Sequence, residues 1–164
     1  MTDDLARLVA GEHHDPHGVL GAHPVDGGVV VRAFRPGAIS MRLIPELGPA
    51  LEMERAHRAD GVFEVFVPGQ KVPFAHRLEA TWDGGTSFAY DDPYSFLPTL
   101  GELDLHLISE GRHEQLYDVL GAHERELNGI AGTSFAVWAP SARAVGVAGD
   151  FNLWNALVHP MRSL

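Results

Sequence analysis

Four histidines near the N-terminus have the type and spacing to bind a metal ion: His13, His14, His17 and His23. Neutral imidazole is a common metal ligand, so a metal site is one hypothesis for this segment. Neighbouring side chains such as His13 and His14 point to opposite sides of an extended chain, however, and no cysteine offers a thiolate to complete a site. We therefore expect no metal and no cofactor, and interpret these histidines as solvated loop residues or as packing residues.

Paired carboxylates are a second group that could do chemistry, since general acid–base catalysis often uses two of them. Asp3-Asp4 and Asp91-Asp92 are pairs in sequence only, and the second pair precedes Pro93 in a turn, where aspartate caps the backbone. The sequence has no G-x-G-x-x-G, Walker or G-x-S-x-G motif for a nucleotide or a serine nucleophile. We expect no catalytic residue in this chain.

The charge balance argues against two classes of partner. Twelve Lys and Arg against 22 Asp and Glu give a net charge of −10, whereas nucleic acids and anionic membranes require a cationic surface. No apolar run reaches the roughly 18 residues of a spanning helix. The acidic start Met1-Thr2-Asp3-Asp4 does not resemble a secretory signal. We therefore expect a cytoplasmic protein with no nucleic-acid partner and no membrane partner.

The elements that would position side chains are mainly strands. Eighteen Gly and 11 Pro divide the chain into short segments that are β-branched or alternate between apolar and polar residues. Five strands are predicted, at residues 29–34, 39–43, 62–67, 74–82 and 87–90. Short strands at this spacing, separated by Gly and Pro turns, are typical of an immunoglobulin-like β-sandwich, so the predicted fold class is mainly β with short helices.

Helices and further strands are predicted outside that sandwich. An amphipathic helix is predicted at residues 3–10, and residues 94–108 resemble a linker. A second helix is predicted at 109–120, followed by strands at 133–138 and 144–148. Strands therefore resume after an interruption of helix and linker.

An internal repeat relates the two strand-rich parts. The pentapeptide V-L-G-A-H at residues 19–23 recurs unchanged at residues 119–123. Each copy is followed by a Gly-containing turn and by a strand that ends in an aromatic residue, one further residue and a proline. These endings are Phe34-Arg35-Pro36 and Trp138-Ala139-Pro140. Because the matches occur in the same order, they indicate two related β-modules.

The second copy of the repeat is the shorter one. The first copy continues through the strands of residues 62–90, whereas the second reaches Leu164 without an equivalent of them. Two strands alone are marginally stable in water. We therefore expect an incomplete second β-sandwich, in which residues from 124 onward are loosely held or pair with another chain through an open strand edge.

The motifs together resemble a known family. The matching segments are H-D-P-H at 14–17 with the V-L-G-A-H after it, D-P-Y-S-F-L-P at 92–98, G-E-L-D-L-H at 101–106, E-G-R-H at 110–113, F-A-V-W-A-P at 135–140 and G-D-F-N at 149–152. This set resembles the N-terminal end of bacterial 1,4-alpha-glucan (glycogen) branching enzymes, those of the actinobacterial type in particular. The resemblance extends over essentially the whole chain.

The resemblance implies a domain organisation and an activity. Residues 1–105 resemble the extra N-terminal β-sandwich of these enzymes, and residues 106–164 resemble a linker helix and the start of a family 48 carbohydrate-binding module. The family's catalytic (β/α)-barrel, which cleaves α-1,4-glucan and transfers the piece to form an α-1,6 branch, is absent from these residues. The resemblance thus implies an accessory part, inactive alone, whose partners are α-glucan or glycogen and its own catalytic barrel.

The resemblance also singles out Trp154 and Asn152 as substrate-binding candidates. In some relatives the Trp after G-D-F-N contacts glucan, and packing on its own sheet is the alternative for Trp154. Asn152 could bond to a sugar hydroxyl or cap the turn. The family pattern has Gly before this Trp, and Leu153 stands there in this chain, so we expect a shifted turn. Trp138, which aligns with Phe34, is expected to pack in a core.

Two other functions remain open from the sequence. One is a stand-alone, non-catalytic glucan-binding β-sandwich protein, and the other is an interaction domain without affinity for glycans. Retardation on a glycogen-containing gel that is lost in Trp154→Ala would favour the first of these.

Overall fold

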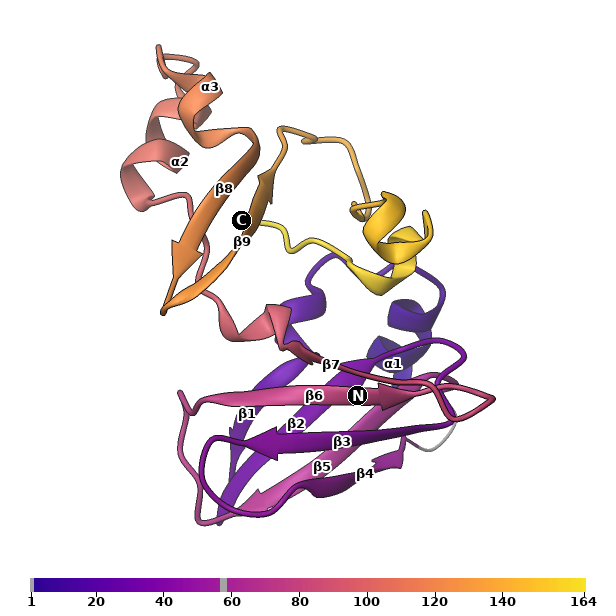
Figure 1. Cartoon of the computed structure of the whole chain (residues 1–164). Coiled ribbons are helices and arrows are strands. Elements are labelled where there is room, and N and C mark those ends of the chain that lie inside the picture. The colour runs from indigo at the N-terminus through magenta and orange to yellow at the C-terminus, as the bar shows by residue number, and fades with distance from the viewer. Residues whose placement is uncertain (1, 57–58) are drawn as a thin grey trace. The chain divides into compact units, whose positions relative to one another are not determined.

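A computed structural model describes residues 2–56 and 59–164 (Figure 1). Backbone contacts divide the chain into two compact units. The first unit contains Met1–Ser95 and Arg143–Ser163, and the second unit contains Phe96–Ala142 together with Leu164. The domain boundary expected between residues 105 and 106 stays a prediction.

The first unit is built on a seven-stranded antiparallel sheet. Its strands are β1 (Gly21–Val25), β2 (Gly28–Phe34), β3 (Ser40–Pro45), β4 (Leu51–Arg55), β5 (Val62–Pro68), β6 (His76–Thr81) and β7 (Ser87–Asp91). They are hydrogen-bonded in the order β1-β2-β5-β4-β3-β6-β7. Strand β4 joins the two halves, since Met53 pairs with Met41 of β3 and Arg55 pairs with Phe63 of β5. The sheet curls at β4, so its halves face each other as in a sandwich (Figure 1), which confirms the mainly β fold class.

The core of the first unit lies between the two halves of the curled sheet, because alternate residues of each strand point inward. The most buried of these side chains are at most 2% exposed, and they are Val29, Val31, Ala33, Met41, Leu43, Phe63, Leu78 and Ala80. A second cluster forms where the helix α1 (Thr2–Val9) packs Leu5 and Leu8 against Leu20, Phe34 and Val62. Burial of each large aliphatic side chain stabilises the fold by about 1.5–3 kcal/mol.

Most elements of the first unit agree with the sequence-based prediction. The expected helix at 3–10 is α1, and the five expected strands are β2, β3, β5, β6 and β7. Strands β1 and β4 were missed. Strand β1 contains Pro24, which is tolerated because β1 lies at the sheet edge. Strand β4 has only Leu51 and Met53 as apolar residues, too few to show alternation.

The second unit departs from the prediction in its helices. Helix α2 (Glu102–Ser109) lies within the expected linker at 94–108, and α3 (Leu116–Val119) covers only a part of the helix expected at 109–120. Helix α2 ends at Ser109, and Gly111 just after it has a φ of +66°, the left-handed backbone that closes a helix C-terminus. The expected linker and helix were therefore wrong, because Gly111 and not Gly121 is the first helix stop.

A two-stranded sheet forms the rest of the second unit. Strands β8 (Gly121–Leu127) and β9 (Ile130–Ala136) pair antiparallel, and none of their residues is buried. The strand expected at 133–138 is therefore β9, shifted toward the N-terminus. Residues 144–148 form only an isolated bridge between Gly146 and Pro160, so the strand expected there was wrong. Two backbone hydrogen bonds accompany this bridge, from the Val147 N–H to the His159 carbonyl at 2.9 Å and from the Met161 N–H to the Val145 carbonyl at 2.8 Å.

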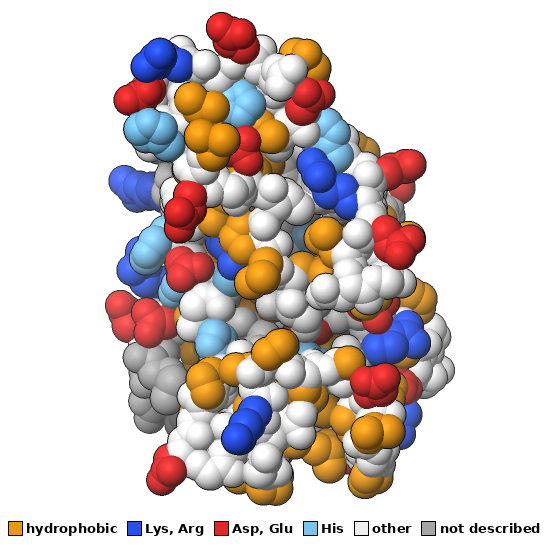
Figure 2. Space-filling model, turned by 90° about the vertical axis from the view of Figure 1, so that its left-hand side faces the viewer, with side chains coloured by type: hydrophobic (Ala, Val, Ile, Leu, Met, Phe, Trp, Pro, Cys, Tyr) orange, Lys and Arg blue, Asp and Glu red, His pale blue; other side chains and the backbone are white. Residues whose placement is uncertain are grey.

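Four short 3-10 helices complete the chain among the described residues: η1 (Pro16–Gly18), η2 (Pro93–Ser95), η3 (Asp150–Asn152) and η4 (Ala156–Val158). No helix in the described ranges is long and apolar enough to cross a membrane. Charged side chains of both signs are interspersed with apolar ones on the face drawn in Figure 2. Lys and Arg form no continuous patch among the coloured side chains of that face.

The repeat inferred from the sequence has the same local structure in both copies. The Leu20 N–H bonds to the Pro16 carbonyl at 2.8 Å, and the Leu120 N–H bonds to the Leu116 carbonyl at 2.8 Å. The histidine that ends each copy bonds through Nε2 to the leucine carbonyl, at 3.0 Å for His23 and 2.9 Å for His123. The V-L-G-A-H sequence is therefore a helix-to-strand turn that the histidine side chain locks.

Candidate functional site

Both predicted binding residues lie in the loop at residues 149–155, G-D-F-N-L-W-N, which belongs to the first unit. The loop begins with the short helix η3. The backbone N–H groups of Asn152 and Trp154 both donate to the Gly149 carbonyl, at 3.1 and 2.9 Å. The loop is therefore a closed turn that fixes the backbone of both candidate residues.

The side chain of Asn152 is engaged inside the loop and is 9% exposed. Its Oδ1 accepts from the Gly149 N–H at 2.9 Å, and its Nδ2 donates to the carbonyls of Val147 at 2.8 Å and Asn155 at 3.1 Å. Nδ2 also lies 3.0 Å from Nδ1 of His159. This geometry supports the capping alternative for Asn152, whereas its bond to a sugar hydroxyl stays a prediction.

Leu153 and Trp154 both have a left-handed backbone. The φ angles are 53° at Leu153 and 59° at Trp154. Leu153 thus adopts a conformation that glycine adopts easily, and the expected shift of the turn relative to the family stays a prediction. A left-handed backbone costs a residue with a Cβ atom about 1–2 kcal/mol. The bonds that close the loop hold it in this strained form.

Trp154 presents its side chain to solvent while its ring nitrogen is held. The residue is 71% exposed, and Nε1 donates to Oδ1 of Asp150 at 2.9 Å. Phe151 and Leu153 of the same loop are 62% and 90% exposed. A large exposed aromatic side chain beside a carboxylate suits a ligand with both apolar C–H faces and hydroxyl groups, such as a sugar. Sequence reasoning missed Asp150, because its contact with Trp154 arises only when the loop closes.

Trp138 does not pack in a core among the described residues. It is 60% exposed, whereas Phe34, the residue at the same place in the first copy of the repeat, is 3% exposed. The expectation of a core Trp138 was therefore wrong for this chain. The reason is physical: Phe34 packs against α1, Leu20 and Val62, whereas the two-stranded sheet of β8 and β9 contains no buried residue.

A buried arginine anchors the segment that follows the loop. Arg35 is 8% exposed, donates through Nη1 to the Val158 carbonyl at 3.2 Å and lies with Cζ 4.2 Å from the centre of the Tyr90 ring. Burial and the charge of Arg35 lower the pKa of His159 to about 4. The imidazole of His159 is thus neutral near pH 7, and its Nδ1 can accept the hydrogen bond from Asn152.

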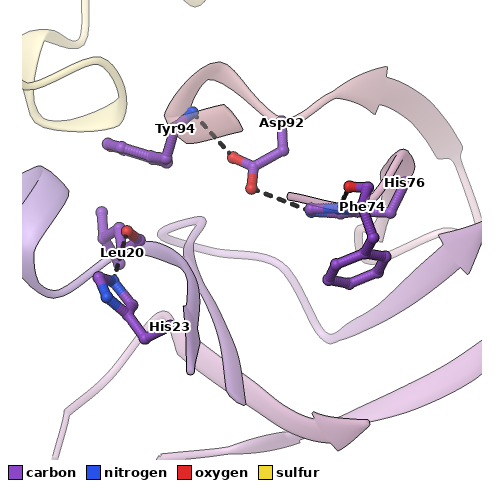
Figure 3. Close-up of polar contacts among 6 residues, drawn as sticks. All are labelled: Leu20, His23, Phe74, His76, Asp92 and Tyr94. Carbon is purple, nitrogen blue, oxygen red and sulfur yellow. Dashed lines mark hydrogen bonds and ion pairs between the residues drawn. The ribbon is translucent and has the colours of Figure 1, made fainter. Parts of the chain in front are cut away.

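His76 and Asp92 form a buried pair elsewhere in the first unit (Figure 3). His76 Nε2 lies 3.1 Å from Asp92 Oδ2, and His76 Nδ1 lies 3.1 Å from the Phe74 carbonyl. Burial alone would lower the pKa of His76, but the bonds to Asp92 and Phe74 raise it above its ordinary value. Asp92 Oδ1 also accepts from the Tyr94 N–H at 3.0 Å, which confirms its expected turn-capping role. With side chains 1% and 0% exposed, the pair is closed to a substrate.

The N-terminal histidines have separate roles. The rings of His13 and His14 stack 5.4 Å apart, so the expectation that they point to opposite sides was wrong. His13 accepts the Asp15 N–H at Nδ1, His17 lies edge-on to the Tyr94 ring, and His23 locks its turn. In the part of the chain that the structure describes, no group of three His, Cys, Asp or Glu side chains is arranged to hold a metal ion.

Comparisons with known proteins give two family matches. The family model described as alpha-1,4-glucan branching enzyme GlgB, N-terminal domain, matches residues 1–94. The model described as carbohydrate-binding module 48 (isoamylase N-terminal domain) matches residues 119–164. The two matches divide the chain in the same order as its two copies of the repeat.

Individual relatives are similar along nearly the whole chain. The 1,4-alpha-glucan branching enzyme GlgB 1 of Streptomyces coelicolor is 56% identical over 98% of this chain and 20% of its own length. The branching enzyme GlgB of Thermobifida fusca is 53% identical over 98% of this chain and 22% of its own length. The chain therefore spans about a fifth of the length of the curated relatives it matches.

A comparison with solved structures matches a smaller part of the chain. A pullulanase from Bacillus acidopullulyticus aligns at 20% identity over 53% of this chain and 11% of its own, with a TM-score of 0.42.

Proposed function

Because the chain belongs to the family of the alpha-1,4-glucan branching enzyme GlgB N-terminal domain, we propose that it is the accessory N-terminal part of a 1,4-alpha-glucan branching enzyme. The resemblance inferred from the motifs is confirmed by these matches. Cleavage of an α-1,4-glucan and transfer of the piece to form an α-1,6 branch are proposed for a catalytic (β/α)-barrel outside these 164 residues. The chain alone is proposed to be inactive.

The proposed enzyme has two accessory domains in this chain, an N-terminal sandwich at residues 1–105 and the start of a family 48 carbohydrate-binding module at 106–164. The family match at residues 119–164 supports the second of these. The proposed partners are α-glucan and the catalytic barrel, and the proposed compartment is the cytoplasm, where no nucleic acid or membrane is bound. The net charge of −10 supports the last point, because nucleic acids and anionic membranes repel such a chain.

The observation that carries a glucan-binding role is the side chain of Trp154, which is 71% exposed on a closed loop. Glycogen affinity electrophoresis tests it. We expect a gel that contains glycogen to retard the chain and to retard Trp154→Ala much less. Trp138→Ala is the matched control, since Trp138 is 60% exposed but lies outside the loop. Equal retardation of wild type and Trp154→Ala would contradict the proposed contact.

The accessory role is tested by transfer onto a catalytic domain. The chain would replace the matching fifth of the Streptomyces coelicolor relative, and branch formation would be measured by the α-1,6 proton signals of the product. We expect the hybrid enzyme to branch amylose and the 164-residue chain to produce no branches. Branching by the chain alone would refute the proposal. Glycogen binding together with an inactive hybrid would favour the alternative of a stand-alone glucan-binding protein.

A further inference from the structure

The indole of Trp154 is unusual in being both exposed and tethered. Its Nε1–H donates to Oδ1 of Asp150 at 2.9 Å, while 71% of the residue is open to solvent. A hydrogen bond to an ionised carboxylate is among the stronger hydrogen bonds in proteins. The polar edge of the ring is therefore engaged within the chain, and the apolar part of the ring remains for a ligand.

The backbone on both sides of this contact is fixed. The Trp154 N–H bonds to the Gly149 carbonyl at 2.9 Å, and the Leu153 N–H bonds to the Asp150 carbonyl at 3.3 Å. The two residues joined by the contact are therefore held at a set separation by the main chain. The freedom left to Trp154 is rotation of its side chain, and the bond to Asp150 restricts this rotation.

A side chain that is already restricted before binding loses less conformational entropy when the ligand binds. Immobilising one flexible side chain on binding costs about 0.5–1.5 kcal/mol, and a side chain already held avoids that cost. For a weakly bound sugar, this amount corresponds to a change in Kd of about 2- to 10-fold. The bond from Trp154 to Asp150 holds the indole before a sugar binds, and so preorganises it for binding.

We propose that Asp150 is a positioning residue for α-glucan binding, whose carboxylate fixes the Trp154 indole so that its ring meets the sugar. This inference rests on the proposed glucan contact of Trp154. Asp150 is exposed, and the bond to Trp154 ties two residues of one loop, so its removal leaves the core unchanged. Asp150 needs only an oxygen acceptor for this role, so asparagine can replace it.

Titration of the 164-residue chain with maltoheptaose, followed by NMR of the three Trp indole N–H signals, tests the proposal. We expect Asp150→Ala to raise Kd by about 2- to 10-fold and to speed hydrogen exchange of the Trp154 indole. Asp150→Asn should restore both values, because its Oδ1 is also an acceptor. Asp60→Ala is the charge control, since it removes another exposed carboxylate outside the loop.

The outcomes separate the two proposals. If Trp154→Ala abolishes binding while Asp150→Ala leaves Kd and indole exchange at the wild-type values, the positioning role is refuted and the glucan contact stands. If Asp150→Asn weakens binding as much as Asp150→Ala, an acceptor is not what the site needs, and the positioning role is again refuted. If Trp154→Ala binds as well as wild type, or wild type does not bind, the glucan contact itself is refuted and the positioning role with it.

Discussion

At the scale of single residues, Leu153 has a left-handed backbone conformation that is unfavourable for a residue with a side chain. Its φ of 53° costs about 1–2 kcal/mol, and glycine would remove that cost at an entropic cost of about 0.5–1 kcal/mol. We expect Leu153→Gly to raise the free energy of unfolding by about 0.5–1 kcal/mol. Urea denaturation measures this change. Leu97→Gly is the control, because Leu97 is 83% exposed and has no left-handed backbone; an equal response of both variants would exclude backbone strain as the cause.

His76 is a buried residue whose charge state the stability of the fold depends on. Both of its ring nitrogens face oxygen acceptors, Asp92 Oδ2 and the Phe74 carbonyl, which only the doubly protonated imidazolium satisfies. Its folded pKa is raised by the bonds to these acceptors. The stabilisation is therefore fully present below the unfolded pKa of about 6.5 and is lost as the pH rises through the folded pKa.

The expected result is a pH-dependent difference between wild type and His76→Gln. Glutamine keeps a donor for Asp92 but does not titrate. The stability advantage of wild type in urea denaturation should be greatest near pH 6 and should shrink as the pH is raised toward 9. A difference that stays constant over this range would show that His76 does not change its charge there.

At the scale of elements, the two V-L-G-A-H turns form a natural pair for comparison. Gly21 and Gly121 have φ angles of 87° and 103°, so alanine is strained at both. A Cβ at Gly21 would lie 2.7 Å from Cβ of Tyr94, whereas at Gly121 the nearest atom is 3.9 Å away. We expect Gly21→Ala to lower the free energy of unfolding by about 1–3 kcal/mol more than Gly121→Ala, measured by urea denaturation. If both variants lose the same free energy of unfolding, Tyr94 moves aside for the added methyl group at no cost.

The elements also show how far the sequence alone can predict this fold. Alternation or runs of β-branched and aromatic residues, bounded by Gly and Pro turns, predicted β2, β3 and β5–β7, and one face of β2, β3 and β6 is buried in the core. Strands β1 and β4 were not predictable in this way, since their place in the sheet comes from pairing with neighbours and not from their own pattern. The helix expected at 109–120 was wrong because a Gly stop within it, Gly111, was overlooked.

The candidate site was predictable in its position but not in its contacts. The G-D-F-N motif located the loop, and the turn-capping alternative for Asn152 agrees with its three internal hydrogen-bond partners. The left-handed Leu153 could not be predicted, because propensity alone argues against it. The bond from Trp154 to Asp150 depends on the closed turn, and the composition of the loop gives no direct sign of it.

At the scale of the whole molecule, two neutral histidines lie where residues Arg143–Ser163 meet the rest of the first unit. Burial and Arg35 lower the pKa of His159 to about 4. Burial and Arg162 lower the pKa of His17 to about 4, while Asp15 and Asp92 oppose that shift. Because both folded values lie below the ordinary value of about 6.5, their stabilisation is present above pH 6.5 and is lost as the pH falls toward 4. Protonation also adds a positive charge beside an arginine at each contact.

Acidification should therefore release Arg143–Ser163 from the first unit before the sandwich itself unfolds. The amides of Val147 and Met161, which bond to the carbonyls of His159 and Val145, report on this segment. We expect their hydrogen-exchange protection factors to fall between pH 6.5 and 4, while the core amides of β2 and β5 stay protected. In His159→Gln the fall should begin at lower pH, because one of the two titrating groups is gone. Simultaneous loss of protection in the segment and in the core would refute a separate release.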